Sequence, residues 1–375
     1  MPAVPPMTRP RRPRRADRAD APRPVSGRGG DGLGFDVDAG GARDGGLDDR
    51  SAGVLRYATD YHAPVLLAET LDLLVTDPAG LYVDGTLGGG GHAAALLDAL
   101  GPDALVVGID QDPQALARAA DRLAPAAGAG RFVALQGNFG DLAGLLRRAG
   151  LAGRPAAGVL LDLGVSSHQI DAAERGFAFS ADGPLDMRMG DAGETAAELV
   201  ARLSAGDLAD VIYAYGEERR SRGIARAVKA AAPATTGELA KAVRQSVPGK
   251  DEVKSLARVF QALRIAVNAE LDVLEAALPA ALDVLAPGGR LAVIAYHSLE
   301  DRRAKQFLKT GRFSGTVEKD LYGNPLTPWT AVTRRAVVAG DAELALNPRA
   351  RSARLRVAEK AARPSPEPPE RRPDA

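Results

Sequence analysis

The segment from Leu81 to Asp112 constrains the fold most strongly, because two apolar runs flank four consecutive glycines, Gly88 to Gly91. The first run is typical of a buried parallel strand, and Ala93 to Leu100 predicts a helix that packs back on the sheet. The second run ends on Asp110, about 20 residues after the turn, where such folds place a carboxylate on a ribose. The segment therefore predicts a βαβ unit that binds a nucleoside-containing cofactor.

The glycine turn also excludes two common nucleotide-binding classes. Glycines let the backbone turn tightly and approach a ligand closely, since a Cβ at these positions would collide with it. The spacing does not follow G-x-G-x-x-G, and no Lys-Ser/Thr pair follows the turn. A dinucleotide-dependent dehydrogenase and a P-loop nucleotidase are therefore disfavoured.

The composition narrows the remaining classes. The chain has 375 residues, 45% of them hydrophobic, with formal net charge zero, which does not exclude local basic faces that bind nucleic acid. It has no cysteine, and its four histidines form no close pair, so we expect no metal site. No apolar run reaches about 18 residues, so we expect no membrane span and a cytoplasmic protein.

Both ends differ from the rest of the chain. Residues 1–56 are rich in Arg, Pro and Gly and carry few large apolar side chains, so they cannot bury enough surface to offset their ordering entropy. They lack the apolar core of a secretory signal. We predict disorder for residues 1–56 and 360–375, and an α/β domain formed by residues 57–190 and 285–359.

Three more strands are predicted, together with amphipathic helices at 67–74 and 113–123. The strands cover Arg131 to Leu135, Gly158 to Gly164 and Arg290 to Ala295, and the breaker Pro287-Gly288-Gly289 precedes the last of them. Ligands of open α/β sheets gather beyond the carboxyl ends of the strands. The residues expected there are Asp110, Phe139, Asp162, Tyr296 and His297.

Residues 191–284 are too long a connection for one crossover helix and predict a helical insertion. Thr195 to Glu198 and Thr235 to Glu238 have capping-box spacing, so each is expected to open a helix. An apolar stripe at helical intervals follows, formed by Leu256, Val259, Phe260, Leu263, Val267, Leu271, Leu274 and Leu278. The insertion would stand beside the cofactor crevice, where a large substrate enters.

The strand and glycine pattern fits a class I S-adenosylmethionine-dependent methyltransferase, a Rossmann-like α/β fold. Longer motifs resemble one family, the bacterial 16S ribosomal RNA cytosine-N4 methyltransferases, from about Tyr61 to Glu359. These motifs are Tyr61-His62-Ala63-Pro64-Val65-Leu66, Asp84-Gly85-Thr86 with Gly90-Gly91-His92, Leu161 to Ser167 with Gln169, Glu174-Arg175-Gly176-Phe177, Gly183 to Met189, Tyr215 to Arg219, His297 to Arg302 and Asn347 to Ser352.

The resemblance implies S-adenosylmethionine as cofactor and 16S rRNA within the small ribosomal subunit as partner, in the decoding region. It places the cofactor contacts on Gly90, Gly91, His92, Asp110, Phe139, Asp162 and Gln169. Asp110 would accept from both ribose hydroxyls, and Phe139 would stack on adenine. The sequence departs from the family at Gly89, His168 and Tyr296, where Arg, Pro and Phe are usual.

The catalytic candidates are Asp162, Ser166, Ser167 and His297. Attack by a cytosine amine needs hydrogen-bond acceptors that take up its developing charge. Other nucleic-acid amino-methyltransferases carry a D/N/S-P-P-Y/F/W motif after the fourth strand, whereas this chain has no proline or aromatic residue between Asp162 and Ser167. Structural alternatives are that Asp84 caps the glycine turn and that His297 belongs to a strand-to-helix turn, with Ser298 and Asp301 at capping spacing.

Basic residues of the insertion and the C-terminal region are expected collectively to contact RNA phosphates, although each alone is more typical of a solvated helix face. The set comprises Arg219, Arg220, Arg222, Arg226, Lys229, Lys241, Arg244, Lys250, Lys254, Arg258, Arg264, Arg334, Arg335, Arg349, Arg351, Arg354 and Arg356. The alternatives are a catalytically inactive RNA-binding ribosome-assembly factor and a methyltransferase of a small molecule or protein. Monomer and homodimer both remain open.

Overall fold

The computed structural model describes residues 57, 64–314, 319 and 326–362. The predicted N-terminal extension, residues 1–56, lies outside the described residues, as do Tyr61 and His62 of the first motif. The predicted C-terminal tail begins at residue 360, whereas the structure continues its last strand to Lys360 and places residues 363–375 outside the described part.

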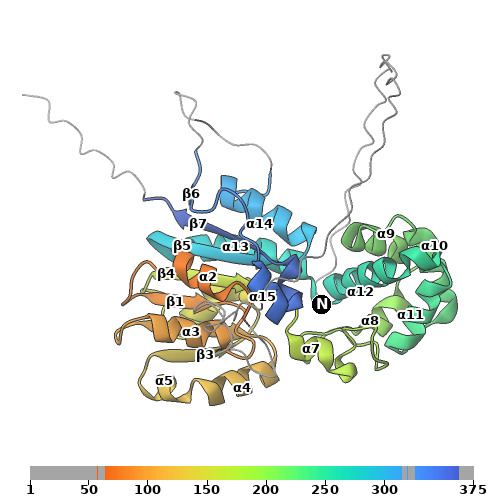
Figure 1. Ribbon diagram of the computed structural model, residues 1–375, viewed down its shortest axis with the longest axis horizontal. Coiled ribbons are helices and arrows are strands. Elements are labelled where there is room, and N and C mark those ends of the chain that lie inside the picture. The colour runs from red at the N-terminus through yellow and green to blue at the C-terminus, as the bar shows by residue number, and fades with distance from the viewer. Residues whose placement is uncertain (1–56, 58–63, 315–318, 320–325, 363–375) are drawn as a thin grey trace, which may run out of the picture. The chain divides into compact units, whose positions relative to one another are not determined.

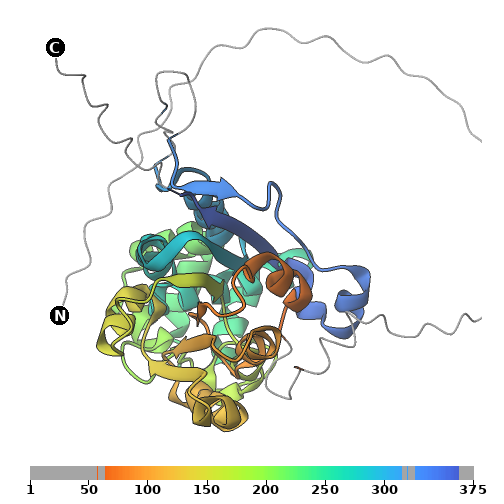
Figure 2. The same cartoon turned by 90° about the vertical axis from the view of Figure 1, so that its left-hand side faces the viewer.

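A seven-stranded sheet forms the centre of the fold, in the order β3-β2-β1-β4-β5-β7-β6. Its strands are β1 (Leu81–Asp84), β2 (Leu105–Asp110), β3 (Phe132–Gln136), β4 (Ala156–Asp162), β5 (Leu285–Ala295), β6 (Trp329–Ala331) and β7 (Arg354–Lys360). β1 to β5 are parallel, whereas β7 runs antiparallel to β5 and β6. Figures 1 and 2 show the strands from gold β3 to blue β6 and β7. The expected class I methyltransferase sheet is confirmed, and β6 and β7 are additional to the five predicted strands.

The fifth strand begins earlier than predicted. Pro287, Gly288 and Gly289 were expected to precede it, but β5 starts at Leu285 and includes them. The register against β4 shifts between Ala156 and Gly158, Gly288 has φ +81°, and a Cβ on Gly289 would lie 2.7 Å from the Ala156 carbonyl oxygen. The breaker therefore produces a bulge within the strand rather than ending it.

Helices cover both faces of the sheet and give two apolar cores. On one face, α6 (Leu142–Arg148), α13 (Glu270–Val284) and α14 (Ser298–Thr310) bury residues such as Leu278 and Phe307. The other core includes Leu74 and Leu96, from α2 (Leu67–Leu74) and α3 (Gly91–Ala99). The remaining elements of this part are α4 (Pro113–Arg122), α5 (Ala124–Gly128), η1 (Phe139–Asp141), α15 (Asp341–Leu346) and η4 (Pro348–Ser352). None of the helices in the described ranges is long and apolar enough to cross a membrane.

The segment after β4 forms a helical unit with its own core, drawn in green in Figure 1. Its elements are α7 (Ser167–Asp171), η2 (Ala173–Arg175), α8 (Ala196–Arg202), α9 (Ala205–Gly216), α10 (Ser221–Ala231), α11 (Thr236–Arg244), η3 (Gly249–Asp251) and α12 (Glu252–Asn268). Both predicted capping boxes are confirmed, at Thr195 with Glu198 and at Thr235 with Glu238.

The predicted apolar stripe belongs to two helices rather than one. α12 ends at Asn268, and Ala269, with φ +48°, turns the chain into α13. Leu256 and Leu263 pack in the core of the helical unit, whereas Leu274 and Leu278 pack on the sheet. The insertion was expected to extend through residue 284, but its last helix is part of the sheet layer, so α13 connects the helical unit rigidly to the core.

Gly158 provides a test of the packing between β4 and α2. A Cβ there would lie 2.7 Å from two ring carbons of Tyr82 and 2.9 Å from Leu74, which are both buried. We expect Gly158→Ala to lower the free energy of unfolding by about 1–3 kcal/mol, because the strand cannot take an added methyl without displacing these side chains. The measurement is urea unfolding followed by circular dichroism. Gly153→Ala is the matched control, since its Cβ would meet nothing within 4 Å, and equal losses in both variants would contradict the expectation.

Candidate active site

The glycine turn presents bare backbone at the carboxyl end of β1. Gly88 and Gly90 have φ of +51° and +76°, values that a side chain rarely adopts. Gly90 caps α3 and faces away from the site, because its Cβ would lie 3.2 Å from Leu123 and 3.4 Å from Ala119. Gly88, Gly89 and Gly91 line a cavity, whereas Gly90 is not among its lining residues. Gly90 thus shapes the turn rather than bordering the space beside it.

This cavity lies where the carboxyl ends of β1, β2, β3 and β4 meet, and we call it the cofactor cavity. It brings together most of the residues predicted from the sequence: Gly91, His92, Asp110, Phe139, Asp162, Ser166 and Gln169. A carboxylate, an aromatic ring and exposed backbone beside a helix N-terminus suit the ribose, the base and the charged end of a nucleoside cofactor. The described residues therefore fit S-adenosylmethionine at this place.

Asp110 is held rigidly at the end of β2. Its Oδ2 accepts from the Gly88 N–H at 2.8 Å, and its Oδ1 accepts from the Asp112 N–H at 2.9 Å. Burial raises the pKa of Asp110, although both N–H contacts favour the charged form. Each oxygen retains a further lone pair, so the carboxylate is positioned to accept two hydroxyl donors from the cavity.

Asp162 connects three elements at the end of β4. Its Oδ1 accepts from the Tyr296 hydroxyl at 2.8 Å, and its backbone N–H donates to Thr86 Oγ1 at 2.7 Å. His92 Nδ1 lies 3.7 Å from Asp162 Oδ2, while His92 Nε2 lies 3.1 Å from the Val65 carbonyl oxygen. The second contact fits the tautomer that carries its proton on Nε2, which leaves Nδ1 as an acceptor facing Asp162.

Two buried carboxyls at this edge of the sheet favour the neutral form. Burial raises the pKa of Asp162 to about 8, with repulsion from Asp84 adding to the shift and the Tyr296 hydroxyl opposing it. Burial likewise raises the pKa of Asp84 to about 7, although Asp84 Oδ1 accepts from the Thr86 N–H at 3.2 Å. That contact is the turn-capping alternative considered for Asp84. A cation placed beside these two groups would favour their ionised forms.

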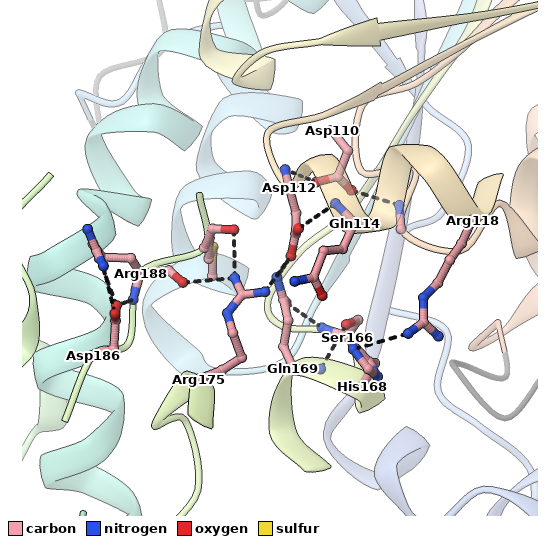
Figure 3. Close-up of polar contacts among 12 residues, drawn as sticks. Asp110, Asp112, Gln114, Arg118, Ser166, His168, Gln169, Arg175, Asp186 and Arg188 are labelled. Carbon is pink, nitrogen blue, oxygen red and sulfur yellow. Dashed lines mark hydrogen bonds and ion pairs between the residues drawn. The ribbon is translucent and has the colours of Figure 1, made fainter. Parts of the chain in front are cut away.

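The loop after β4 is fixed by a polar network centred on Asp112, which Figure 3 shows. Asp112 Oδ2 accepts from Gln169 Nε2 at 3.1 Å and from Arg175 Nη1 at 2.9 Å. Arg175 also donates to the carbonyl oxygens of Arg188 and Met189. Because Gln169 and Met189 both line the cofactor cavity, this network holds part of its wall in place.

Ser166 has a structural role as well as a place in the lining. It is the N-cap of α7, where its Oγ accepts from the Gln169 N–H at 3.2 Å and Gln169 Oε1 accepts from the Ser166 N–H at 3.0 Å. Ser167 is the first residue of the helix and is not among the residues that line the cavity. The two serines, predicted together, therefore have different surroundings.

His297 caps α14 and, like Ser167, is not among the residues that line the cofactor cavity. Its Nδ1 accepts from the Glu300 N–H at 3.4 Å, and Glu300 Oε2 accepts from the Tyr296 and His297 N–H groups at 2.8 and 3.3 Å. The capping pair is thus His297 with Glu300, one residue earlier than the predicted Ser298 with Asp301. The structural alternative for His297, a place in the turn between β5 and α14, is therefore confirmed.

Glu270, His297 and Glu300 place possible metal-ligand atoms within 4.8 Å of one another. The charge of Glu270 is already compensated by Arg264, which contacts its two oxygens at 2.8 and 3.0 Å. Burial alone would raise the pKa of Glu300, but the contact with His297 and the charge of Arg264 outweigh it, and the pKa is lowered. These pairings account for the cluster without an ion, and the absence of a metal stays a prediction.

Several lining residues were not predicted as site residues. They include Thr86, Gln111, Asn138 and Met189, with Asn268 and Glu270 in a smaller adjoining cavity, whereas Tyr296 lies at the strand ends as expected. Asn138 follows a predicted strand, so its position in the sequence was a usable signal. Asn268 gave none, because it lies within a helical pattern more than 100 residues after β4.

The raised pKa of Asp162 predicts how stability depends on pH. The pKa of this carboxyl is about 8 in the folded protein, above its ordinary value of 3.8. Its protonated form therefore stabilises the folded state, and this stabilisation is lost as the pH rises between these two values. We expect Asp162→Asn, which stays neutral, to reduce the fall in stability between pH 5.5 and 8.5 by on the order of 1–3 kcal/mol. Urea unfolding of the ligand-free protein at both pH values measures this. Asp103→Asn, at an exposed position, is the control, and an unchanged pH dependence in Asp162→Asn would contradict the assignment.

The family is shown by comparison with known proteins. The model described as the MraW methylase family matches residues 59–361. A protein of Prosthecochloris aestuarii named "Ribosomal RNA small subunit methyltransferase H" is 50% identical over 318 residues, covering 80% of this chain and 95% of that protein. One of the same name from Methylobacterium sp. is 51% identical over 319 residues, covering 82% and 93%. A solved rRNA methylase from Streptococcus thermophilus aligns over 79% of this chain and 94% of its own at 14% identity, with a TM-score of 0.36. Because about half of the aligned residues are identical in such relatives and the family model matches residues 59–361, the chain belongs to the MraW methylase family.

Proposed function

We propose that this protein transfers the methyl group of S-adenosylmethionine to N4 of a cytidine in 16S ribosomal RNA. The observation that carries the proposal is the cofactor cavity between the glycine turn and Asp110, in a chain that matches the MraW methylase family. The relatives are named as methyltransferases of the small-subunit RNA. The decoding region, the assembled small subunit as substrate and the cytoplasm as location belong to the same proposal.

The cofactor would lie across the carboxyl ends of β1 and β2. Asp110 would accept both ribose hydroxyls, Phe139 would contact the base, and the backbone at Gly88, Gly89 and Gly91 would face the methionine part. S-adenosylmethionine supplies an electrophilic methyl group and a permanent positive charge. That charge fits the end of β4, because the buried carboxyl of Asp162 becomes a stronger acceptor when a neighbouring cation favours its ionised form.

The nucleophile requires acceptors rather than a strong base. The lone pair of a cytosine amine is delocalised into the ring, and hydrogen bonds from the amine to fixed acceptors favour the form that can attack. Asp162 and Ser166 line the cavity, whereas Ser167 and His297 do not. Asp162 is the better placed acceptor, because the Tyr296 hydroxyl fixes its orientation while Ser166 is engaged in capping α7.

The two alternative functions predict different outcomes in a methyl-transfer assay. An inactive assembly factor would bind RNA without transferring a methyl group. A methyltransferase of a small molecule or a protein would not modify ribosomal subunits. The glycine turn, Asp110 and Asp162 all border the cofactor cavity, which supports catalysis over binding alone.

Single-turnover rates should separate the acceptor candidates. We expect Asp162→Asn to lower the rate of methyl transfer on the order of 10- to 100-fold. An amide still accepts a hydrogen bond, but it has no negative charge to offset the positive charge that develops on the attacking amine. Ser167→Ala should stay close to the unmodified protein, since Ser167 does not line the cavity. A rapid-quench assay on the preformed complex of protein, S-adenosylmethionine and small subunit gives both rates. An undiminished rate in Asp162→Asn would remove this residue from the reaction.

The function itself is tested by methyl transfer from labelled S-adenosylmethionine to small ribosomal subunits that lack the modification, followed by nucleoside analysis. The expected product is N4-methylcytidine. Asp110→Ala should weaken cofactor binding in calorimetry by about 1.5–3 kcal/mol, because it removes charge-assisted hydrogen bonds to ribose. Asp103→Ala, which removes an exposed carboxylate, is its control. Label in protein or small molecules but not in RNA would reject the proposed substrate, and unchanged affinity in Asp110→Ala would reject the cofactor contact.

A further inference from the structure

Ion pairing divides the basic residues that were predicted to contact RNA. Several are already neutralised by carboxylates, or donate to carbonyl oxygens, within the described part of the chain. These are Arg220 with Asp251, Arg244 with Glu252, Arg258 with Glu218, Arg264 with Glu270, Arg349 with Asp171, Arg356 with Asp301, and Lys229 with the carbonyls of Val200 and Ala201. Because a paired side chain must give up its partner to bind a phosphate, the unpaired cations matter more for RNA.

Three unpaired cations, Lys305, Arg351 and Arg354, line a surface hollow beside the active site, which we call the basic groove. It lies between the first turns of α14 and the segment formed by η4 and the start of β7. Its lining comprises Tyr296, His297, Ser298, Asp301, Arg302, Lys305, Arg351, Ser352 and Arg354. Sequence periodicity does not bring these residues together, because the pairing of β7 with β5 is what places η4 beside α14.

The groove has a net positive charge. Asp301, its one carboxylate, is bound through both oxygens by Arg356 at 2.7 and 3.1 Å. Arg302 pairs with the exposed Glu217 at 3.3 Å. Lys305, Arg351 and Arg354 are exposed and form no ion pair with any residue that the structure describes. The amino end of α14, a helix of 13 residues, adds a partial positive charge.

Tyr296 connects the groove to the reaction. It lines both the basic groove and the cofactor cavity, and its hydroxyl donates to Asp162 at 2.8 Å. A nucleotide whose phosphate lies among Lys305, Arg351 and Arg354 would therefore lie next to a side chain that also borders the cofactor cavity. Enzymes that modify a base take it out of the stack, and so need the backbone fixed beside the pocket.

We propose that the basic groove binds the phosphodiester backbone of single-stranded RNA immediately beside the target cytidine. This inference rests on the proposed function, which it deepens by naming the surface that holds the substrate. Its partner is a polyanion with a single strand free to enter the site, in agreement with the unpaired charge and the shared wall at Tyr296. Phosphate contacts position the strand, and the choice of base is made inside the cavity.

The test replaces all three unpaired cations, in the variant Lys305→Gln with Arg351→Gln and Arg354→Gln. We expect its dissociation constant for unmodified small subunits to rise at least 10-fold near 150 mM salt. The slope of log K against log salt concentration should flatten by roughly 2, because about three phosphate contacts are lost. The loss should appear in KM for the subunit, with the affinity for S-adenosylmethionine and the melting temperature unchanged.

A control removes the same three formal charges elsewhere, in the variant Arg147→Gln with Arg148→Gln and Lys309→Gln, one of which, Arg148, pairs with the exposed Asp141 at 2.9 Å. These residues end α6 and α14, and Lys309 lies on the same helix as Lys305 but in its last turn. The control should bind subunits within about twofold of the unmodified protein. Equal weakening in both variants would show a general charge effect, and normal binding by the groove variant would show that RNA passes elsewhere; either result overturns the proposal. Failure of the unmodified protein to methylate subunits would instead reject the proposed function, while the binding comparison still decides the groove.

Discussion

The buried carboxylate of Asp112 is the interaction on which the geometry of the site depends. It is almost fully buried, and it accepts from the Gln114 N–H at 3.0 Å as well as from Gln169 and Arg175. A charge at this depth is tolerated only when its partners are in place, and removing one partner leaves an uncompensated charge. The first turn of α4, the helix α7 and the loop at residues 188 and 189 are therefore fixed together, and they form one wall of the cofactor cavity.

A second constraint joins that wall to the helical unit. Asn268 donates to the carbonyl oxygens of Met187 and Arg264 and accepts from the Met189 N–H at 2.8 Å. Met187 and Ala269 both have positive φ, at 63° and 48°, although neither is glycine. Such conformations persist only where surrounding contacts hold them, and they concentrate at functional sites. The amide of Asn268 thus ties the end of α12 to the loop that borders the cofactor cavity, beside the connection through α13.

Electrostatics at the site follow from burial as much as from residue type. Asp110, Asp84 and Asp162 all lie at the ends of parallel strands, where solvent is excluded and the charged form is disfavoured. Asp110 receives two backbone N–H donors, whereas Asp162 receives one hydroxyl and repulsion from Asp84. An aspartate at the end of β2 therefore suits a ribose contact, whereas one at the end of β4 suits an acceptor that becomes stronger beside a cation.

The sequence by itself determined the βαβ unit with Asp110, the approximate positions of the first five strands and the two capping boxes of the insertion. These features depend on local spacing, because strand alternation, glycine turns and i, i+3 caps involve residues close in the chain. The family motifs extended this to the cofactor residues, most of which the structure brings into one cavity. Only the tertiary structure decided the break at Ala269, the strands β6 and β7, and the separation of Ser166 from Ser167.

The tertiary structure also decided which arginines are free to meet RNA. Arg356 and Arg354 are two residues apart in one strand, yet Arg356 pairs with Asp301 while Arg354 opens onto the basic groove. Asp301 is more than 50 residues away in the sequence, so no local pattern could identify it as a partner. Charge pairing is a property of the folded chain, because only packing brings the two side chains together. That is why the sequence predicted a set of basic residues for RNA contact but not which of them have carboxylate partners.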